Sequence, residues 1–269
     1  MSERRRIFLV PMAYFFATRL SGVFAAVSWI AIYPLAIAVS AVLYVSPFDL
    51  ESWLGVVLAM LAVYSLYELG YMDNDTRTVA RESSPTERLT DTEKRFFLRY
   101  RWRIVVFRLV FVAALLVCIR LLVPYNVGGF YGLLAGLGAI AVGFVLYNST
   151  RGRLNLPLHG LLVGARFCTP GLIVVPAGRW EYLTLMLVAF PLPNLVERAG
   201  EGRYDIQPLA RVAAHRDGFR VIYYSLALFA AAALFYESRI GILSLIVLAW
   251  FFLVRLAGFV ASRLGARGA

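Results

Sequence analysis

Lysine, histidine and cysteine are scarce in this sequence. Lys94 is the only lysine beside 26 arginines, and the 269 residues include two histidines and two cysteines. Cys118 and Cys168 lie in apolar stretches, which excludes a disulfide framework and a cysteine-based metal site, and His159 and His215 have no metal-binding spacing. Only 16% of residues are charged and 61% are hydrophobic, a balance that excludes a water-soluble enzyme and an intrinsically disordered chain.

Long apolar runs account for most of the chain. A helix needs about 20 apolar residues to cross the hydrocarbon core of a bilayer. Eight segments reach or approach this length: 21–46, 53–71, 103–123, 126–147, 157–176, 181–196, 219–236 and 240–261. Pro34 predicts a kink in the first, and residues 5–18 have the pattern of a short amphipathic helix lying in the membrane interface. We therefore expect an all-α integral membrane protein with a single domain over 1–269.

Basic residues are divided unequally between the two ends of these spans. The termini and the loops of one face carry 20 lysines and arginines, and the loops of the other face only Arg120, Arg179 and Arg239. The positive-inside rule places the basic face and both termini in the cytoplasm, and we expect a bacterial cytoplasmic (inner) membrane. The net charge of +11 then suits anionic lipid headgroups, and we expect no nucleic acid partner. Two long loops, about 72–102 and 197–218, lie on this face, and Thr90 with Glu93 predicts a capping box that opens a helix over 91–101.

Acidic residues at the end of the second span form a first candidate site. Glu68 falls inside the span, where an ionisable side chain faces a cavity or a partner. At helical spacing Glu68, Tyr71 and Asp75 share one face, which Thr78 and Glu82 continue. Mg²⁺ prefers carboxylate oxygens together with substrate phosphates. A solvated helix end with arginines as ion-pair partners explains the same residues.

A second acidic cluster follows the sixth span, at Asn194, Glu197 and Glu201. Four spans separate the two clusters, so both emerge on the cytoplasmic side. Two carboxylate sets facing one cytoplasm-facing polar cavity would hold Mg²⁺ ions that stabilise a diphosphate leaving group. Neighbouring arginines would contact the same phosphate oxygens.

These two runs resemble the signature motifs of the UbiA superfamily of intramembrane prenyltransferases. The positions of the first motif, N-D-x-x-D-x-x-x-D followed by a proline, a threonine and an arginine, are occupied by Asn74, Asp75, Thr78, Glu82, Pro85, Thr86 and Arg88. The second motif aligns with Asn194, Glu197 and Glu201. Family members usually have nine spans, so we expect a bundle of eight to nine transmembrane helices. Thr78 and Asn194 replace acids and glutamates replace aspartates, so the geometry of the site must differ.

The resemblance implies Mg²⁺-dependent transfer of a prenyl group from a diphosphate donor to a hydrophobic or aromatic acceptor. One branch of the superfamily instead transfers phosphoribose from phosphoribosyl pyrophosphate to a polyprenyl phosphate in cell-envelope glycan synthesis, and the motifs do not separate the two. A transporter or lipid-binding protein is the rival from another class, with Glu68 and Arg166 on a substrate or proton pathway. The replacements at Thr78 and Asn194 also leave open an inactive member.

The predicted site joins three sets of residues. We expect catalytic roles for Asp75, Glu82, Glu197 and Glu201. We expect metal ligation by these four carboxylates together with Asn74 and Asn194. We expect substrate contacts from Glu68, Tyr71, Arg88, Tyr147, Arg166 and Arg203. Arg166 interrupts the fifth span, where a buried arginine needs a phosphate or a carboxylate as its partner.

Overall fold

The computed structural model describes residues 3–20, 22–44, 49–79, 86–123, 127–150, 152–176, 180–204 and 206–265, without the side chains of residues 3, 4 and 203. Over this part the chain is helical and contains no strand. The elements before the first long loop are η1 (Glu3–Phe8), α1 (Ala13–Arg19), α2 (Val23–Ile30), η2 (Ala31–Leu35), α3 (Ala36–Leu43), α4 (Leu50–Asp73) and η3 (Asn74–Thr78). Those after it are α5 (Asp91–Leu122), α6 (Val127–Ser149), α7 (Asn155–Leu172), α8 (Trp180–Ala189), α9 (Pro191–Ala199), η5 (Gly202–Tyr204), α10 (Gln207–Ala214), α11 (Arg216–Tyr236) and α12 (Ile242–Arg263).

Each of the eight expected spans falls on one helix or on consecutive helices. Six of these helical segments are long and apolar enough to cross a membrane: Val23–Leu43, Leu50–Thr78, Asp91–Leu122, Val127–Ser149, Arg216–Tyr236 and Ile242–Arg263. The expected character of an all-helical integral membrane protein is therefore supported. The expected total of eight to nine spans stays a prediction, because α7 and the α8–α9 segment are not among these six. The orientation of the termini and the cytoplasmic position of the cavity also stay predictions.

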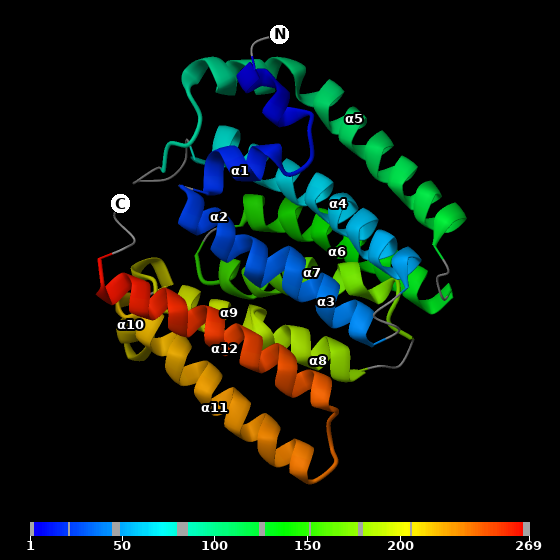
Figure 1. Cartoon of the computed structure of the whole chain (residues 1–269). Helices are drawn as coiled ribbons and strands as arrows, with labels where there is room; N and C mark the ends of the chain where they lie inside the picture. Colours follow the sequence, from blue (N-terminus) through cyan, green and yellow to red (C-terminus); the bar gives the residue numbers. More distant parts are fainter. Residues whose placement is uncertain are drawn as a thin grey trace.

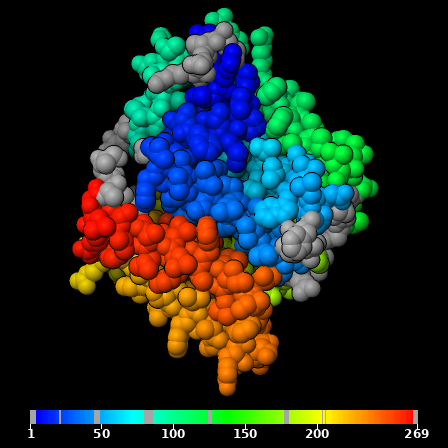
Figure 2. All heavy atoms as spheres, in the orientation of Figure 1, coloured from blue at the N-terminus to red at the C-terminus, as the bar shows by residue number. Residues whose placement is uncertain are grey.

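The long helices lie alongside one another in a bundle (Figure 1). Antiparallel neighbours in the chain, α4 with α5, α6 with α7 and α11 with α12, make the most extensive contacts. Helix α7 lies between α4 and the α8–α9 segment, and α6 packs against α4 and α7. On the face drawn in Figure 2, the N-terminal segment, α2–α3 and α12 lie side by side.

Proline accounts for the irregularity of the first and sixth expected spans, whereas the π-helical turn η3 at the end of α4 contains no proline. Pro34 lies inside η2, a π-helical turn between α2 and α3, so the helix is irregular at the position where a kink was expected. The sixth span was expected to be one helix over 181–196, and this was wrong, because the chain breaks at Phe190 into α8 and α9. Pro191, at the first turn of α9, has no N–H to continue the hydrogen bonding of α8, and its ring suits a helix start.

Two other helices differ from expectation in extent. The capping box of Thr90 and Glu93 is confirmed, but the helix that it opens runs on without interruption as the 32-residue α5. Residues 5–18 do not form one helix at the interface. They are broken at Met12, which has φ 69°, and they pack against the bundle through the fully buried side chains of Phe8 and Tyr14.

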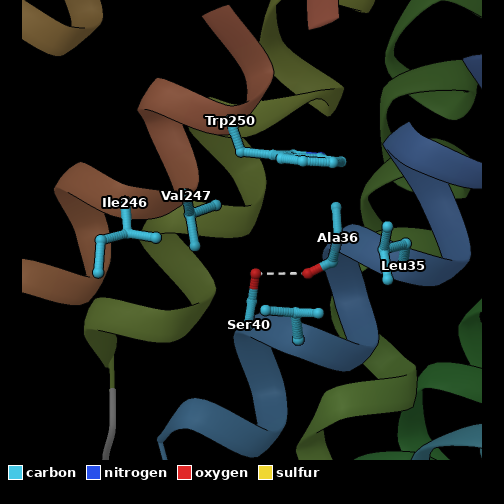
Figure 3. A pocket seen from close by; sticks show the side chains of 7 residues that line it. Leu35, Ala36, Ser40, Ile246, Val247 and Trp250 are labelled. Carbon is cyan, nitrogen blue, oxygen red and sulfur yellow. Dashed lines mark hydrogen bonds between the residues drawn. The ribbon is translucent and has the colours of Figure 1, made fainter. Parts of the chain in front are cut away.

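A small apolar cavity of about 150 Å³ lies between α3 and α12 (Figure 3). Trp250 and Val247 of α12 face Ala36 and Ser40 across it. The hydroxyl of Ser40 donates to the carbonyl of Ala36 in its own helix, so it offers no free donor to a ligand. We therefore interpret this cavity as a gap in the packing between two helices, and we do not take it as the candidate site.

Close packing of α6 on α7 requires a glycine at position 136. A Cβ atom there would lie 2.1 Å from Oγ1 and 2.8 Å from Cβ of the buried Thr169, whereas a Cβ at Gly138 meets nothing within 4 Å. We expect Gly136→Ala to lower the free energy of unfolding by about 1–3 kcal/mol through overpacking. The matched Gly138→Ala is expected to leave stability unchanged or to raise it by up to about 1 kcal/mol, because alanine favours the helix. Thermal unfolding of the detergent-purified variants measures both, and equal melting temperatures would contradict this packing.

Candidate functional site

A carboxylate of α4 caps the first α-helix of the chain. The N-terminus of α1 has no side-chain cap of its own. Glu68 supplies one from α4, because its oxygens accept hydrogen bonds from the backbone N–H groups of Met12 at 3.0 Å and of Phe15 at 2.7 Å. A carboxylate at a helix N-terminus satisfies unpaired N–H groups and interacts favourably with the helix dipole. Glu68 therefore fixes α1 on the bundle.

Arg108 of α5 completes this attachment. Its Nη2 lies 3.0 Å from Oε2 of Glu68, and neither side chain is exposed. The guanidinium also donates to the carbonyls of Phe8 at 3.0 Å and Val10 at 3.1 Å. The oxygens of Glu68 are thus already bonded within the protein, and its predicted contact with substrate stays a prediction.

Asp75 lies where α1 meets η3 and is 2% exposed. It accepts a hydrogen bond from the hydroxyl of Tyr14 at 2.7 Å, and ion pairs join it to Arg19 at 2.9 Å and Arg88 at 3.4 Å. Burial, followed by the charge of Asp75, raises the pKa of Tyr14 well above its usual range, so the hydroxyl remains a donor. The expected shared face of Glu68, Tyr71 and Asp75 is confirmed, because all three contact α1.

A polar cavity of about 350 Å³ opens beside this ion-pair network, between α1, α4, α6, α7 and α9. Its polar lining comes from arginines, asparagines, tyrosines and a histidine. The lining residues are Arg19, Tyr67, Tyr71, Asn74, Thr86, Arg88, Phe144, Tyr147, Asn155, His159, Leu162, Val163, Arg166, Asn194 and Arg198. None of these described lining residues is a carboxylate and four are arginines, so the charged groups on the described wall are all cationic.

Arg166 of α7 lies among aromatic rings in the wall of this cavity. Its guanidinium carbon is 4.9 Å from the ring centre of Tyr67 and 5.4 Å from that of Tyr33, and Nη1 donates to the hydroxyl of Tyr71 at 3.4 Å. Cation–π contacts stabilise a desolvated guanidinium. Within the described residues Arg166 has no carboxylate partner, and its buried Nε makes no hydrogen bond.

The second acidic cluster is also paired with arginines. Glu197, 4% exposed, forms a bidentate ion pair with Arg220 of α11, with both N···O distances at 2.7 Å. Glu201 lies 2.8 Å from Arg198 and 3.3 Å from Arg216. Both acids thus bind guanidinium groups.

A second cavity of about 580 Å³ adjoins the first. Arg19 and Arg166 line both cavities. The rest of its wall is mainly apolar and aromatic, with two further arginines at one side: Leu20, Phe24, Ala25, Ser28, Trp29, Ile32, Tyr33, Phe167, Phe190, Arg220 and Arg255. A cationic region therefore continues into an aromatic one.

Four arginines around these cavities keep a buried N–H without a hydrogen-bond partner. The atoms are Nη1 of Arg19 and Nε of Arg166, Arg198 and Arg255. A buried unsatisfied donor is costly, more so on a charged group. All four line one or both of the adjoining cavities, where an anionic ligand could accept hydrogen bonds from them.

The structure brings together part of the predicted site. Residues that line the polar cavity are Tyr71, Asn74, Arg88, Tyr147, Arg166 and Asn194. Residues that lie outside its wall, in ion pairs, are Glu68, Asp75, Glu197 and Glu201. Glu82 and Pro85 lie outside the described residues, as does the side chain of Arg203.

The described residues do not fit the expected magnesium site. Within them no three histidine, cysteine or acidic side chains lie close enough together to hold a metal ion. Asn194, which stands where the motif has an acid, is bonded to the ring Nε2 of His159 at 2.9 Å. Magnesium binding stays a prediction, and no step of the chemistry below depends on it.

Several residues at the cavities were not predicted as site residues from the sequence. Arg19, Arg198, Arg220 and Arg255 look like ordinary topogenic or interfacial arginines when the chain is read alone. Their common feature in the sequence is position, since each falls inside or at the edge of an expected span. Which cavity such a residue lines depends on contacts between segments far apart in the sequence.

Comparison with known proteins adds no assignment. No family model matches the sequence, and neither the curated proteins nor the solved structures contain a significant match. The resemblance to the UbiA superfamily therefore rests on the motif residues alone.

Removal of Glu68 should release the N-terminal segment. We expect Glu68→Gln to lower the free energy of unfolding by about 3–5 kcal/mol, because it leaves the fully buried Arg108 without its charge partner. Thermal unfolding and limited proteolysis of residues 3–20 measure the effect. Glu51→Gln, on the exposed first turn of α4, is the matched control with no expected change. A melting temperature for Glu68→Gln equal to that of the control would contradict the anchoring role.

Proposed function

We propose that the chain is an integral membrane transferase of the UbiA type, which moves a prenyl group from a diphosphate donor to a hydrophobic or aromatic acceptor. The observation that carries the proposal is the junction of two cavities at Arg19 and Arg166. One cavity offers guanidinium groups that suit a diphosphate, and the other offers the aromatic surface that suits an isoprenoid chain. The motif resemblance supports the same class of donor.

The positive charge of the first cavity would promote the transfer by stabilising the diphosphate leaving group. The bond between C1 of the prenyl group and the diphosphate oxygen breaks, and the electron pair leaves with the diphosphate. Preorganised arginines stabilise the charge that develops on this leaving group, and they do so more strongly in a buried site than in water. The acceptor forms a bond to C1, and its displaced proton passes to the diphosphate or to water. Arg88, Arg166 and Arg198 are the residues placed to neutralise the leaving group.

Transfer of phosphoribose to a polyprenyl phosphate is the second candidate function. Arg255 favours it, because this residue of α12 lies in the aromatic cavity with an unpaired Nε and has no carboxylate partner within the described residues. An arginine there suits an acceptor that itself ends in a phosphate. In that reaction the acceptor oxygen bonds to C1 of the ribose as the diphosphate leaves.

Ligand-induced stabilisation separates the donors. A ligand that binds only the folded state adds about 2.7 kcal/mol at a hundredfold excess over its Kd. With magnesium present, we expect geranylgeranyl diphosphate to raise the melting temperature of the detergent-purified protein more than phosphoribosyl pyrophosphate does. Arg166→Gln should abolish most of this rise. Its melting temperature without ligand should stay unchanged or increase, because an unpaired positive charge is removed. Arg95→Gln, an exposed arginine of α5, is the matched control.

Other results would redirect the assignment. Stabilisation by phosphoribosyl pyrophosphate alone would favour the second candidate. If neither donor raised the melting temperature, and if the protein moved a lipid phosphate into vesicles without changing it chemically, a transporter would be favoured.

Arg255 tests the nature of the acceptor. If the acceptor is a polyprenyl phosphate, Arg255→Gln should weaken its binding about 10- to 100-fold, the usual loss for a charged hydrogen bond. Binding of geranylgeranyl diphosphate, whose diphosphate contacts the first cavity, should change little. Equal losses for both ligands would contradict the separate use of the two cavities. Equilibrium binding of each ligand to protein in nanodiscs gives the two affinities.

A further inference from the structure

The first cavity has the charge of an anion site and lacks the charge of a metal site. Arg19, Arg88, Arg166 and Arg198 contribute four guanidinium groups to its wall, and the described lining residues include no carboxylate. The remaining polar groups there are neutral amides, hydroxyls and the His159 ring. A divalent cation in this wall would face repulsion from several arginines at short range.

Two of the described carboxylates of the predicted site are already bound to arginines. Asp75 is held by Tyr14 and two arginines, and Glu197 is held on both oxygens by Arg220. To ligate a metal, each would have to break these buried ion pairs and leave a guanidinium uncompensated. Removing one partner of a buried pair is strongly unfavourable.

Three of the four arginines keep free hydrogen-bonding capacity for a ligand, at Nη1 of Arg19 and at Nε of Arg166 and Arg198. These three atoms are buried and unpaired. Arg166 is further enclosed by the rings of Tyr33, Tyr67 and Phe167, at 5.4, 4.9 and 5.6 Å from its guanidinium carbon. Such surroundings strengthen a charged hydrogen bond, and the planar guanidinium matches the oxygens of a phosphate bidentately.

We infer that this cavity binds the diphosphate of its ligand directly through arginines, without a metal ion held by the protein. The inference rests on the proposed function, since it concerns the same donor. Arg166 and Arg198 contact the phosphate oxygens, while Arg19 and Arg88 divide their charge between Asp75 and the cavity. The cavity then recognises inorganic pyrophosphate and a lipid diphosphate by the same chemistry, and the prenyl chain adds affinity only in the lipid case.

Binding in the presence of excess EDTA tests this inference. The full chain in nanodiscs is titrated with inorganic pyrophosphate and with geranylgeranyl diphosphate, in EDTA and separately in magnesium. We expect binding of the lipid diphosphate in EDTA, with a Kd within a few-fold of that in magnesium and with competition by inorganic pyrophosphate. Binding should weaken as ionic strength increases, because the contacts are ionic.

Substitution of Arg166 and of Arg198 tests whether these two arginines bind the diphosphate. Arg166→Gln and Arg198→Gln should each weaken the binding in EDTA about 30-fold, the loss expected for one charged contact. Arg198→Gln leaves Glu201 paired with Arg216, and Arg166 has no described carboxylate partner, so neither change exposes a buried acid. Melting temperatures without ligand verify folding, Arg166→Lys should restore part of the affinity, and Arg95→Gln should bind as the wild type does.

The outcomes separate this inference from the proposed function. Lipid diphosphate binding that appears only with magnesium would overturn the inference and leave the proposed function standing. Binding in EDTA that both arginine variants retain would also overturn the inference, because the site would lie elsewhere. No binding of either diphosphate under either condition would overturn both.

Discussion

The fully buried ion pair between Glu68 and Arg108 holds the cavity wall in place. Burial of two charges is unfavourable unless further hydrogen bonds satisfy them. Here the backbone of the N-terminal segment provides these bonds: two N–H groups donate to Glu68, and two carbonyls accept from Arg108. The pair thereby joins α1, α4 and α5. Because α1 is held in this way, Tyr14 and Arg19 reach Asp75. Arg19 then lies between the two cavities and lines both of them.

Part of the positive net charge of the chain lies inside the helix bundle. Positive-inside topology explains arginines in loops, but Arg166 and Arg255 lie within helices, among aromatic rings. Ionisable residues inside membrane segments are costly and generally mark functional positions. The acids near the cavities are satisfied by other arginines, so this interior charge has no internal counterpart among the described residues. In the proposed function, the diphosphate of the ligand supplies the missing charge.

The features predictable from the sequence were local ones. Apolar runs located the helices, Pro34 marked the irregular turn, and Thr90 with Glu93 marked the start of α5. The acidic clusters were found, but their partners were not, because the Asp75–Arg19 and Glu197–Arg220 pairs join residues 56 and 23 positions apart. Helical spacing shows which residues share a face and says nothing about what packs against that face. The break at Phe190 was missed for a different reason, since proline inside an apolar run is compatible with either a kink or a new helix.

Neutral residues at two motif positions, and arginines paired with the described acids of the motifs, change the site in the same direction. Thr78 and Asn194 stand where the resemblance places acids, and Asn194 is bonded to His159. Each carboxylate absent from the cavity lowers affinity for a divalent cation, and each guanidinium facing it raises affinity for phosphate. If a magnesium site had simply lost one acid, its other acids would still be free to coordinate a metal ion. Asp75 and Glu197 are instead bound to arginines. The combined changes therefore support the proposed direct recognition of a diphosphate by arginines over simple decay of a magnesium site.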